Sequence, residues 1–444
     1  MRIGVISLGC PKNLVDSEVM LGLLLEAGHQ LVDPDEAEVV IVNTCAFIRD
    51  AEREAEAVIS EILENKGNRK LIVAGCLPQR RGEELLRRFP GIDALIGVNE
   101  FLRIDRIVEE VARDSKPLIS ISRPEALYDH LTPRALGTPP HYAYVKIAEG
   151  CSHACSFCVI PRIRGRYRSR EFESVLAEAA ALAESGVKEI ILIAQDTTRY
   201  GIDLYGRPMI ADLLRELARI EGLRWIRLLY SYPSRIDEEL LRVIAEEEKI
   251  CKYLDIPIQH INDEILRRMR REGGSEAVRR AVEMAREIAP DIALRSTVIV
   301  GFPGEREEHF EELLDFISEA EFDHLGVFIF SPEEGTPAAG MEDQVPDEVK
   351  RERYEAVVEV QTAISLRKKG KMAGKRVEAV VEGVDPETDM PCARAEFQAP
   401  EIDDLILIEN LSREEAEGLK GEFVEVEITG LKGLDLLGRI RRGR

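Results

Sequence analysis

The sequence predicts an α/β protein in three folded parts. The first is an N-terminal parallel α/β sheet domain (1–115), and a linker (116–136) leads to a central, incomplete TIM-like (βα)6 barrel (137–370). A small antiparallel β-barrel ends the chain (371–442). Two runs of alternating strands and helices predict the first two parts, and short strands between turn residues predict the third. With 444 residues, 45% of them hydrophobic, each part has room for its own core.

The first domain alternates short apolar segments with amphipathic ones. We expect strands at Arg2–Gly9, Val39–Cys45, Lys70–Cys76 and Ala94–Gly97, and helices at Val15–Ala27, Asp50–Glu64, Gly82–Phe89 and Glu100–Arg113. Continuously apolar strands separated by amphipathic helices are typical of a parallel sheet covered on both faces. The linker that follows is rich in proline, so we expect little regular structure in it.

A second series of βα units then begins. Its expected strands are Tyr142–Ala148, Glu189–Ala194, Trp225–Tyr230, Tyr253–Ile258, Leu294–Val300 and Leu325–Phe330. Its expected helices are Glu171–Ser185, Ile210–Ile220, Asp237–Glu248, Glu276–Ile288 and Glu305–Glu319, followed by a charged helix at Pro346–Lys371. Six βα units predict an incomplete TIM-like barrel, whose functional residues are expected at the carboxyl ends of the strands.

The tail changes to short strands separated by turns. We expect these at Arg376–Glu382, Cys392–Phe397, Leu405–Glu409, Phe423–Thr429 and Leu436–Arg441. Five short strands in about 70 residues are typical of a small barrel.

Composition excludes several classes of protein. The chain carries 60 Lys and Arg against 83 Asp and Glu, a net charge of −23, which argues against non-specific binding to nucleic acid. No apolar run approaches the roughly 18 residues of a membrane span. The first residues, MRIGVISLG, lack the charged start and long apolar core of a signal peptide. We therefore expect a cytoplasmic protein with no membrane partner.

Three of the eight cysteines form a CxxxCxxC motif, at Cys151, Cys155 and Cys158. In a protein without an export signal, metal binding or catalysis is a better interpretation than disulfides. A structural zinc site normally has a second, distant pair of ligands. Three close cysteines suit three corners of a [4Fe–4S] cluster whose fourth iron is free for another ligand.

A second set of cysteines follows three successive strands of the first domain. Cys10, Cys45 and Cys76 are expected at one edge of the sheet, where open α/β sheets bind ligands. Three thiolates there would hold a second cluster, although cysteines at strand ends are also often buried as small apolar residues. Cys251 and Cys392 have no such partners, and we interpret both as structural.

The motifs resemble those of radical S-adenosylmethionine (SAM) methylthiotransferases, over essentially the whole chain. The ribosomal-protein branch is matched by ISLGCPKNLVDSE, VNTCAF, AGC, CSFCVIPRIRGRYRSR, AQDTTRYG, YLDIPIQH, VIVGFPGE, FSPEEGTPAA and APEID. The resemblance implies methylthiolation of an aspartate β-carbon in small-subunit ribosomal protein S-twelve. The sister branch, which modifies tRNA adenosine, is the alternative, and it typically has GCQMN in place of GCPKN. An iron–sulfur electron carrier without catalytic activity is a third hypothesis.

The resemblance also implies cofactors and site residues. Two [4Fe–4S] clusters are implied, one on Cys10, Cys45 and Cys76 that carries sulfur, and one on Cys151, Cys155 and Cys158 that binds and cleaves SAM. Through these clusters the six cysteines are the catalytic residues. Further SAM contacts are implied at Gln195, Asp196, Thr197, Ile299 and Gly301. His153 is expected to be a loop residue, and Arg162, Arg164, Arg166, Arg168 and Arg170 are open to contact with SAM, with an acidic substrate loop or with solvent.

Partners follow from the same resemblance. They are ribosomal protein S-twelve, free or on the small ribosomal subunit, a reducing electron donor such as flavodoxin or ferredoxin, and a source of sulfide. We expect a monomer. The tail resembles the TRAM domain, which binds RNA in tRNA-modifying relatives. Because this tail is acidic, with Glu401, Asp403 and Asp404 close together, we expect it to recognise a basic protein.

Overall fold

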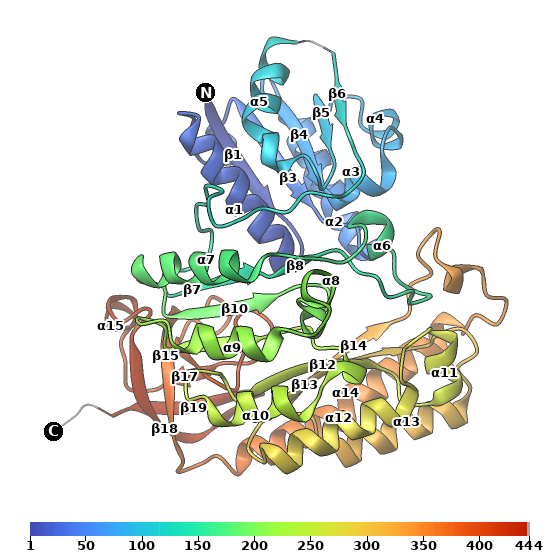
Figure 1. Cartoon of the computed structure of the whole chain (residues 1–444), viewed down its shortest axis with the longest axis vertical. Helices are drawn as coiled ribbons and strands as arrows, with labels where there is room; N and C mark the ends of the chain where they lie inside the picture. The colour runs from blue at the N-terminus through green and yellow to red at the C-terminus, as the bar shows by residue number, and fades with distance from the viewer. Residues whose placement is uncertain (115, 442–444) are drawn as a thin grey trace.

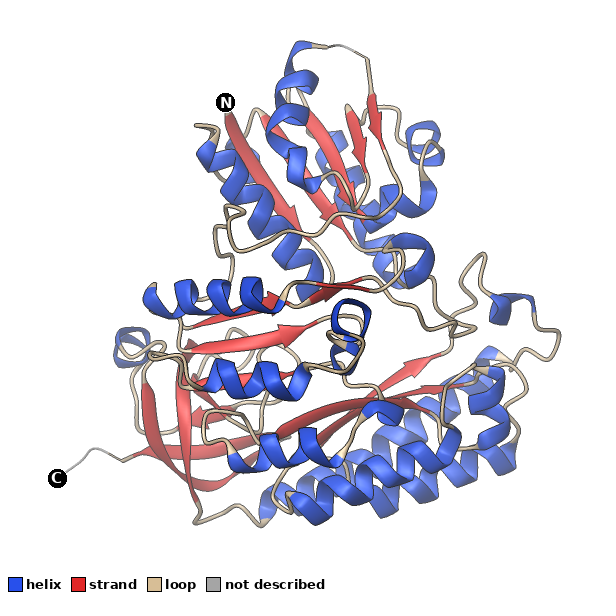
Figure 2. Cartoon of the chain, viewed as in Figure 1, coloured by secondary structure: helices blue, strands red, loops and turns tan. Residues whose placement is uncertain are grey.

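The three parts follow one another as the sequence predicts in the computed structural model, which describes residues 1–114 and 116–441. The predicted domain ends at 115 and 442 lie outside the described residues. In Figure 1 the blue N-terminal domain stands on the barrel, and the red C-terminal barrel packs at one end of it. Figure 2 shows helices covering the sheets of the first two parts. Of the described helices, none has the length and apolar character needed to cross a membrane.

The N-terminal sheet is parallel throughout, in the order β2-β1-β3-β4-β5-β6. Its strands are β1 (Arg2–Ser7), β2 (Gln30–Leu31), β3 (Val39–Thr44), β4 (Lys70–Gly75), β5 (Ala94–Ile96) and β6 (Leu118–Ser120). One face is covered by α1 (Pro11–Glu26) and α5 (Ile104–Arg113), and the other by α2 (Arg49–Glu64), α3 (Cys76–Arg81) and α4 (Glu84–Arg88). Every residue of β3 is buried, as expected for a strand covered on both faces. The prediction of a doubly covered parallel sheet is confirmed.

The linker contains a strand that the sequence did not predict. Residues Leu118–Ser120 form β6, which pairs with β5 from Ala94↔Leu118 to Ile96↔Ser120 and adds a sixth strand to the sheet. The strand is three residues long, lies at an edge and leaves Ile119 40% exposed. Short edge strands carry little hydrophobic periodicity, and the nearby prolines hid this one.

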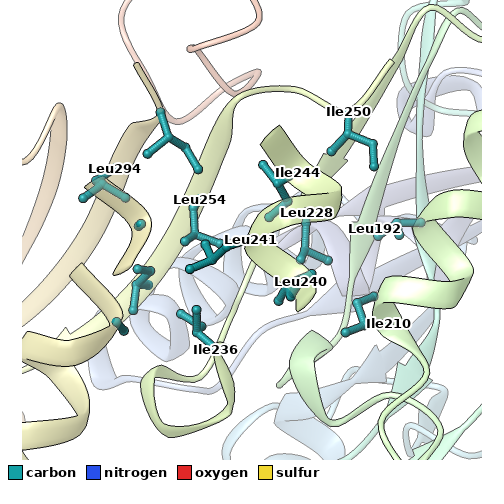
Figure 3. Close-up of a cluster of buried hydrophobic side chains, with 14 of the residues drawn as sticks. Leu192, Ile210, Leu228, Ile236, Leu240, Leu241, Ile244, Ile250, Leu254 and Leu294 are labelled. Carbon is teal, nitrogen blue, oxygen red and sulfur yellow. The ribbon is translucent and has the colours of Figure 1, made fainter. Parts of the chain in front are cut away.

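The six predicted strands of the central barrel are all present. They are β7 (Tyr142–Lys146), β10 (Glu189–Ile193), β11 (Trp225–Leu228), β12 (Tyr253–Gln259), β13 (Ala293–Val300) and β14 (His324–Ile329). The covering helices are α7 (Phe172–Glu184), α9 (Ile210–Ala218), α10 (Glu238–Glu246), α12 (Gly274–Ile288), α13 (Glu307–Ala320) and α14 (Asp347–Gly370). Figure 3 shows how Leu192, Leu228, Leu254 and Leu294, from four strands, pack with Leu241 and Ile244 of α10.

The barrel is split and does not close. Its strands form two parallel sheets, β11-β10-β7 and β12-β13-β14, and β7 and β14 are unpaired edges of these sheets. An isolated parallel β-bridge, Ile226↔Ile250, joins β11 to the segment just before β12. Beyond it, the Asp255 carboxylate accepts a hydrogen bond from Tyr230 N at 2.9 Å, and the Asp255 carbonyl accepts one from Ser231 N at 2.9 Å. The incomplete barrel that the six units predict is confirmed.

Five strands close the C-terminal barrel in the order β15-β16-β17-β19-β18. They are β15 (Arg376–Val384), β16 (Pro391–Ala395), β17 (Ile406–Ile408), β18 (Phe423–Lys432) and β19 (Asp435–Ile440). Four of the pairings are antiparallel, as predicted, but β17 and β19 pair in parallel. A short helix, α15 (Arg413–Gly418), was not predicted, and a Ser412–Glu415 capping box begins it.

Buried charges join the C-terminal barrel to the amino-terminal ends of the central strands. Glu189, the first residue of β10, pairs with Arg227 at 2.8 Å and with Arg394 at 2.6 Å. Arg394 lies in β16 and also pairs with Glu382 at 2.9 Å. Tyr253 at the start of β12 donates a hydrogen bond to Asp403 at 2.7 Å. This end of the central barrel is therefore a docking face for the C-terminal barrel.

The expectation that the acidic segment of the tail recognises a basic protein is wrong for two of its three residues. The Asp403 side chain is 1% exposed and lies 3.4 Å from both Arg295 and His324. Asp404 is 11% exposed and lies 2.8 Å from Lys369 and 3.3 Å from His324. These carboxylates dock one domain on another, and sequence alone cannot distinguish an internal interface from an external one.

This docking face should depend on pH. Burial opposes the charged imidazolium of His324, but Asp403 and Asp404 outweigh it and raise the pKa of His324 above its usual value. Despite burial, His324 and Lys369 lower the pKa of Asp404 to about 2. A raised histidine pKa stabilises the fold fully below about pH 6.5, and this contribution is lost as pH rises through the folded-state pKa. The Asp404 contribution is present above about pH 4 and is lost only as pH falls through about 2.

We therefore expect the unfolding midpoint to fall as pH rises from about 6 to about 9, and to fall less in a His324→Gln variant. Thermal melts of both proteins across this range measure the difference. Equal slopes in the two proteins would show that His324 does not control docking.

Candidate active site

The structure brings the first cysteine triad together at the carboxyl edge of the N-terminal sheet. Cys10 is the residue before α1, Cys45 directly follows β3, and Cys76 is the first residue of α3 after β4. The chain at Gly9 passes so close to Cys45 that a side-chain Cβ at Gly9 would lie 2.5 Å from the Cys45 Cβ. Gly9 has a φ of +92°, so this close turn requires glycine. The predicted positions of the three cysteines at strand ends are thus as observed.

The three thiols are within electrostatic reach of one another. Burial, reinforced by the charges of Cys76 and Cys10, raises the pKa of Cys45 to about 12. Burial also raises the pKa of Cys76, although the positive charge of Arg164 acts to lower it. Burial thus favours the neutral thiols of Cys45 and Cys76, and positively charged iron would reverse this preference because it binds thiolate.

The second triad lies on a loop between two short strands, β8 (Ala148–Glu149) and β9 (Arg168–Ser169). Backbone amides point at two of its sulfurs: His153 N lies 3.4 Å from Cys151 Sγ and Ile160 N lies 3.5 Å from Cys158 Sγ. Burial raises the pKa of Cys151 to about 11, and burial together with Cys155 raises that of Cys158. Amide donors aimed at sulfur are the contacts that stabilise bound thiolates and tune iron–sulfur clusters.

His153, inside this loop, has a structural contact of its own. Its ring stacks on Tyr232 with centroids 4.0 Å apart and planes 6° apart. Its Nε2 lies 2.7 Å from Asp196 Oδ2, so the ring ties the cysteine loop to the end of β10. The expectation that His153 is a loop residue agrees with these contacts.

A buried network of charges lies between Cys76 of the first triad and the strand that leads into the second. Arg164 lies 3.5 Å from Cys76 Sγ, 2.6 Å from Asp16 and 3.3 Å from Glu149. Lys146 pairs with the same two carboxylates, at 2.7 Å from Glu149 and closely with Asp16. The side chains of all four charged residues are 2–6% exposed. Burial favours neutral Glu149, but Lys146 and Arg164 hold its pKa well below the usual value.

Sequence reasoning missed most of this network. Asp16 and Lys146 were assigned to a helix and a strand without a role, and Glu149 to no element. A lysine inside an otherwise apolar strand was the available signal, because a buried cation requires a carboxylate partner. Of the five alternating arginines, Arg164 joins this network, whereas Arg170 pairs with Glu178 and Arg162 donates a hydrogen bond to the Gly335 carbonyl at 3.1 Å.

The residues predicted to contact SAM differ in whether their polar side-chain atoms already have hydrogen-bond partners in the protein. Gln195 donates a hydrogen bond to Glu149 at 3.0 Å, while its buried Oε1 has no partner among the described residues. Thr197 Oγ1 donates to the Leu229 carbonyl at 2.7 Å, and Asp196 pairs with His153. Gln195 Oε1 is therefore a free acceptor for an ammonium group, whereas Asp196 and Thr197 are occupied by protein contacts.

The two predicted residues on the β13 side lie together. Ile299 is 9% exposed and packs beside Phe302 and Phe330. Gly301 has a φ of +72°, and its N–H donates a hydrogen bond to the Glu305 carboxylate at 3.0 Å. A side chain at Gly301 would meet Lys350 at 2.2 Å, so this glycine serves the close approach of α14.

The donor sets fit iron–sulfur clusters better than single metal ions. Among residues 1–114 and 116–441, no three His, Cys, Asp or Glu side chains converge closely enough to coordinate one ion. A cube-shaped cluster makes a different demand, because each thiolate binds its own iron. Three thiols in each set, backbone amides aimed at sulfur and Arg164 beside Cys76 meet that demand.

Comparison with known families agrees with this division of the chain. A family model described as "Radical SAM superfamily" matches residues 145–317, "Uncharacterized protein family UPF0004" matches 2–97, and "TRAM domain" matches 373–440. The solved structure of the radical SAM methyltransferase TsrM from Kitasatospora setae is similar in fold, with a TM-score of 0.56 at 15% identity over 82% of this chain and 89% of that one. The fold and the cysteine loop define a radical SAM enzyme.

Similar proteins show to which family of radical SAM enzymes this chain belongs. Ribosomal protein uS12 methylthiotransferase RimO of Geobacter sulfurreducens is 47% identical over 99% of this chain and 98% of the relative. RimO of Pelotomaculum thermopropionicum is 49% identical over 99% of both chains. This chain belongs to the RimO family of radical SAM methylthiotransferases.

The buried network makes a prediction about stability. Replacing Glu149 by Gln leaves Lys146 and Arg164 with only one carboxylate, a net buried positive charge that should cost about 3–5 kcal/mol. Adding Lys146→Met restores charge balance and should recover at least half of the loss. Denaturant titration of the iron-free chain measures both variants.

An exposed ion pair provides the matched control. Glu109 and Arg113 are 53% and 75% exposed, so Glu109→Gln should cost less than about 1 kcal/mol. If Glu149→Gln cost no more than this control, the network would not hold the two domains together.

Proposed function

We propose that this enzyme transfers a methylthio group to the β-carbon of an aspartate in ribosomal protein uS12, using one [4Fe–4S] cluster on each cysteine triad. The substrate is supported by relatives that are 47% and 49% identical over nearly the full chain and are named for uS12. The two clusters are supported by Arg164, which lies 3.5 Å from Cys76 Sγ of one triad and 3.3 Å from Glu149, two residues before Cys151 of the other. This bridge is the observation that carries the proposal.

The chemistry explains why such a site would be needed. A hydrogen on an aspartate β-carbon is too weakly acidic for an ordinary general base. When bound, the two clusters and SAM would supply an electron, a radical able to remove that hydrogen, and the sulfur and methyl groups. The protein must hold these groups and the substrate in one water-excluded space.

The chain's own residues can perform that task. Cys151, Cys155 and Cys158 would hold one cluster near Gln195, whose free Oε1 can accept a hydrogen bond from the SAM ammonium group. Cys10, Cys45 and Cys76 would hold the other. Glu333, on the segment after β14, accepts a hydrogen bond from Arg49 N at 2.8 Å and pairs with Arg80 at 2.9 Å. These contacts tie the N-terminal domain to the segment that follows the last strand of the barrel.

The net charge of the chain also favours a protein substrate over the alternative substrate, tRNA. The chain has a net charge of −23, which repels a polyanion and attracts a basic ribosomal protein. The reaction would require a one-electron donor such as flavodoxin or ferredoxin and a source of sulfide. We propose that a monomer performs it in the cytoplasm.

The direct test is an anaerobic assay. Enzyme reconstituted with iron and sulfide is given SAM, a reductant and either uS12 or bulk tRNA, and mass spectrometry searches each for a methylthio increment. We expect the increment on one aspartate of uS12 and none on tRNA. An increment on tRNA alone would refute the proposed substrate.

Cysteine variants test the two clusters separately. We expect about eight irons per wild-type chain and about four in either Cys45→Ala or Cys155→Ala. Cys45→Ala should still cleave SAM without transferring sulfur, whereas Cys155→Ala should do neither. Cys251→Ala is the matched control, because Cys251 is buried outside both triads and should leave iron content unchanged. Full iron content or undiminished transfer in Cys45→Ala would contradict a second cluster.

A further inference from the structure

Lys12 is an unpaired buried cation between the N-terminal domain and the barrel. It lies in the first turn of α1, two residues after Cys10, and is 9% exposed. Its ammonium lies 3.3 Å from the centroid of the Tyr230 ring, on the loop after β11. The side chain therefore reaches from the first cysteine triad to the mouth of the barrel.

The lack of a carboxylate partner sets Lys12 apart. The structure describes seven other buried lysines and arginines: Lys146, Arg164, Arg170, Arg227, Lys350, Arg353 and Arg394. Each of these lies within 4.0 Å of an Asp or Glu oxygen. Among the residues that the structure describes, no Asp or Glu oxygen is that close to the Lys12 ammonium. Burying a cation without an anion is costly, so an anionic ligand beside Lys12 would offset that cost.

The surroundings hold Lys12 in place. Tyr230 has a φ of +63°, a conformation that bulky residues rarely adopt, and its N–H donates to the Asp255 carboxylate at 2.9 Å. This contact fixes the ring that faces the ammonium. A ring face attracts a cation but leaves its other N–H donors free for an anion.

We propose that Lys12 binds the carboxylate of the target aspartate and selects for an acidic side chain. The inference rests on the proposed function, and it deepens it by naming a residue that recognises the substrate. In aspartate the carboxylate is bonded directly to the β-carbon. A cation beside Cys10 that holds the carboxylate therefore also places the reacting carbon near the sulfur-carrying triad. Arg164 and Lys146 are unsuited to this role because both already form ion pairs with Asp16 and Glu149.

The test is a double-mutant cycle between enzyme and substrate. Wild-type and Lys12→Met enzymes, both loaded with iron, are titrated with labelled uS12 that carries either the target aspartate or asparagine in its place. A charge-assisted hydrogen bond should make wild-type enzyme bind the aspartate form about tenfold or more tightly than the asparagine form. In Lys12→Met this preference should fall to within about twofold.

Two further variants control for indirect effects. Lys12→Arg keeps the charge and should restore part of the preference. Lys116→Met removes an exposed lysine from the start of the linker that follows this domain and should leave the preference unchanged. Iron content and SAM cleavage without substrate are measured for every variant, so that binding preferences are compared at equal iron content. If Lys12→Met loses iron, the comparison of Lys12→Arg with wild type still decides, because an altered preference at full iron content requires contact with the substrate.

The outcomes separate this inference from the proposed function. If wild-type enzyme neither binds nor modifies uS12, the proposed function and this inference both fail. If wild-type enzyme modifies the aspartate and Lys12→Met keeps the full preference for aspartate over asparagine, only the inference fails. The second result would mean that Lys12 serves the negative charge of the nearby thiolates.

Discussion

The arrangement of this enzyme depends on four charged side chains buried where the N-terminal domain meets the barrel. Lys146 and Arg164 carry two positive charges, and Asp16 and Glu149 carry two negative ones, so the set is neutral as a whole. Each charge is expensive to remove from water, and the cost is offset only in one relative position of the domains. A small rotation of either domain would separate the pairs. The network therefore fixes the distance between two cysteine triads that belong to different folds.

Buried ion pairs also fix the domain interface at the other end of the barrel. Glu189, Arg227 and Arg394 join the central strands to the C-terminal barrel, with Arg227 and Arg394 0% exposed. A third network joins α1 to the barrel, where Arg134 lies 2.5 Å from Glu18 and 2.6 Å from Glu178. Ion pairs are directional, whereas apolar contacts are not, so they suit interfaces that must have a single geometry. The proposed transfer of a methylthio group to one carbon atom has such a requirement.

Local patterns in the sequence were sufficient to predict most of the fold. Short apolar segments such as the one that begins Val39–Thr44 predict strands covered on both faces, and the alternation of βα units places the cysteines at the sheet edge. What could not be predicted depends on contacts distant in sequence. The strand Leu118–Ser120 is defined by its partner β5, and the burial of Asp403 by its contacts with Arg295 and His324.

The candidate site likewise contains some residues that the sequence could predict and others that it could not. The cysteines could be predicted because their spacing carries the chemistry in the sequence itself. Glu149, Asp16 and Lys12 could not, because their significance lies in which charges they meet or lack across a domain boundary. The SAM contact at Gln195 stays a prediction from the resemblance; within residues 1–114 and 116–441, its buried Oε1 has no hydrogen-bond partner.

The proposed function requires that the two triads hold clusters that face one another in a single site. Electron paramagnetic resonance of the enzyme with both clusters reduced tests it most directly, because two nearby spins broaden and split one another's signals. We expect a coupled spectrum in wild-type enzyme that becomes the spectrum of one isolated cluster in Cys45→Ala. A wild-type spectrum equal to the sum of two independent clusters, or one that Cys45→Ala leaves unchanged, would contradict it.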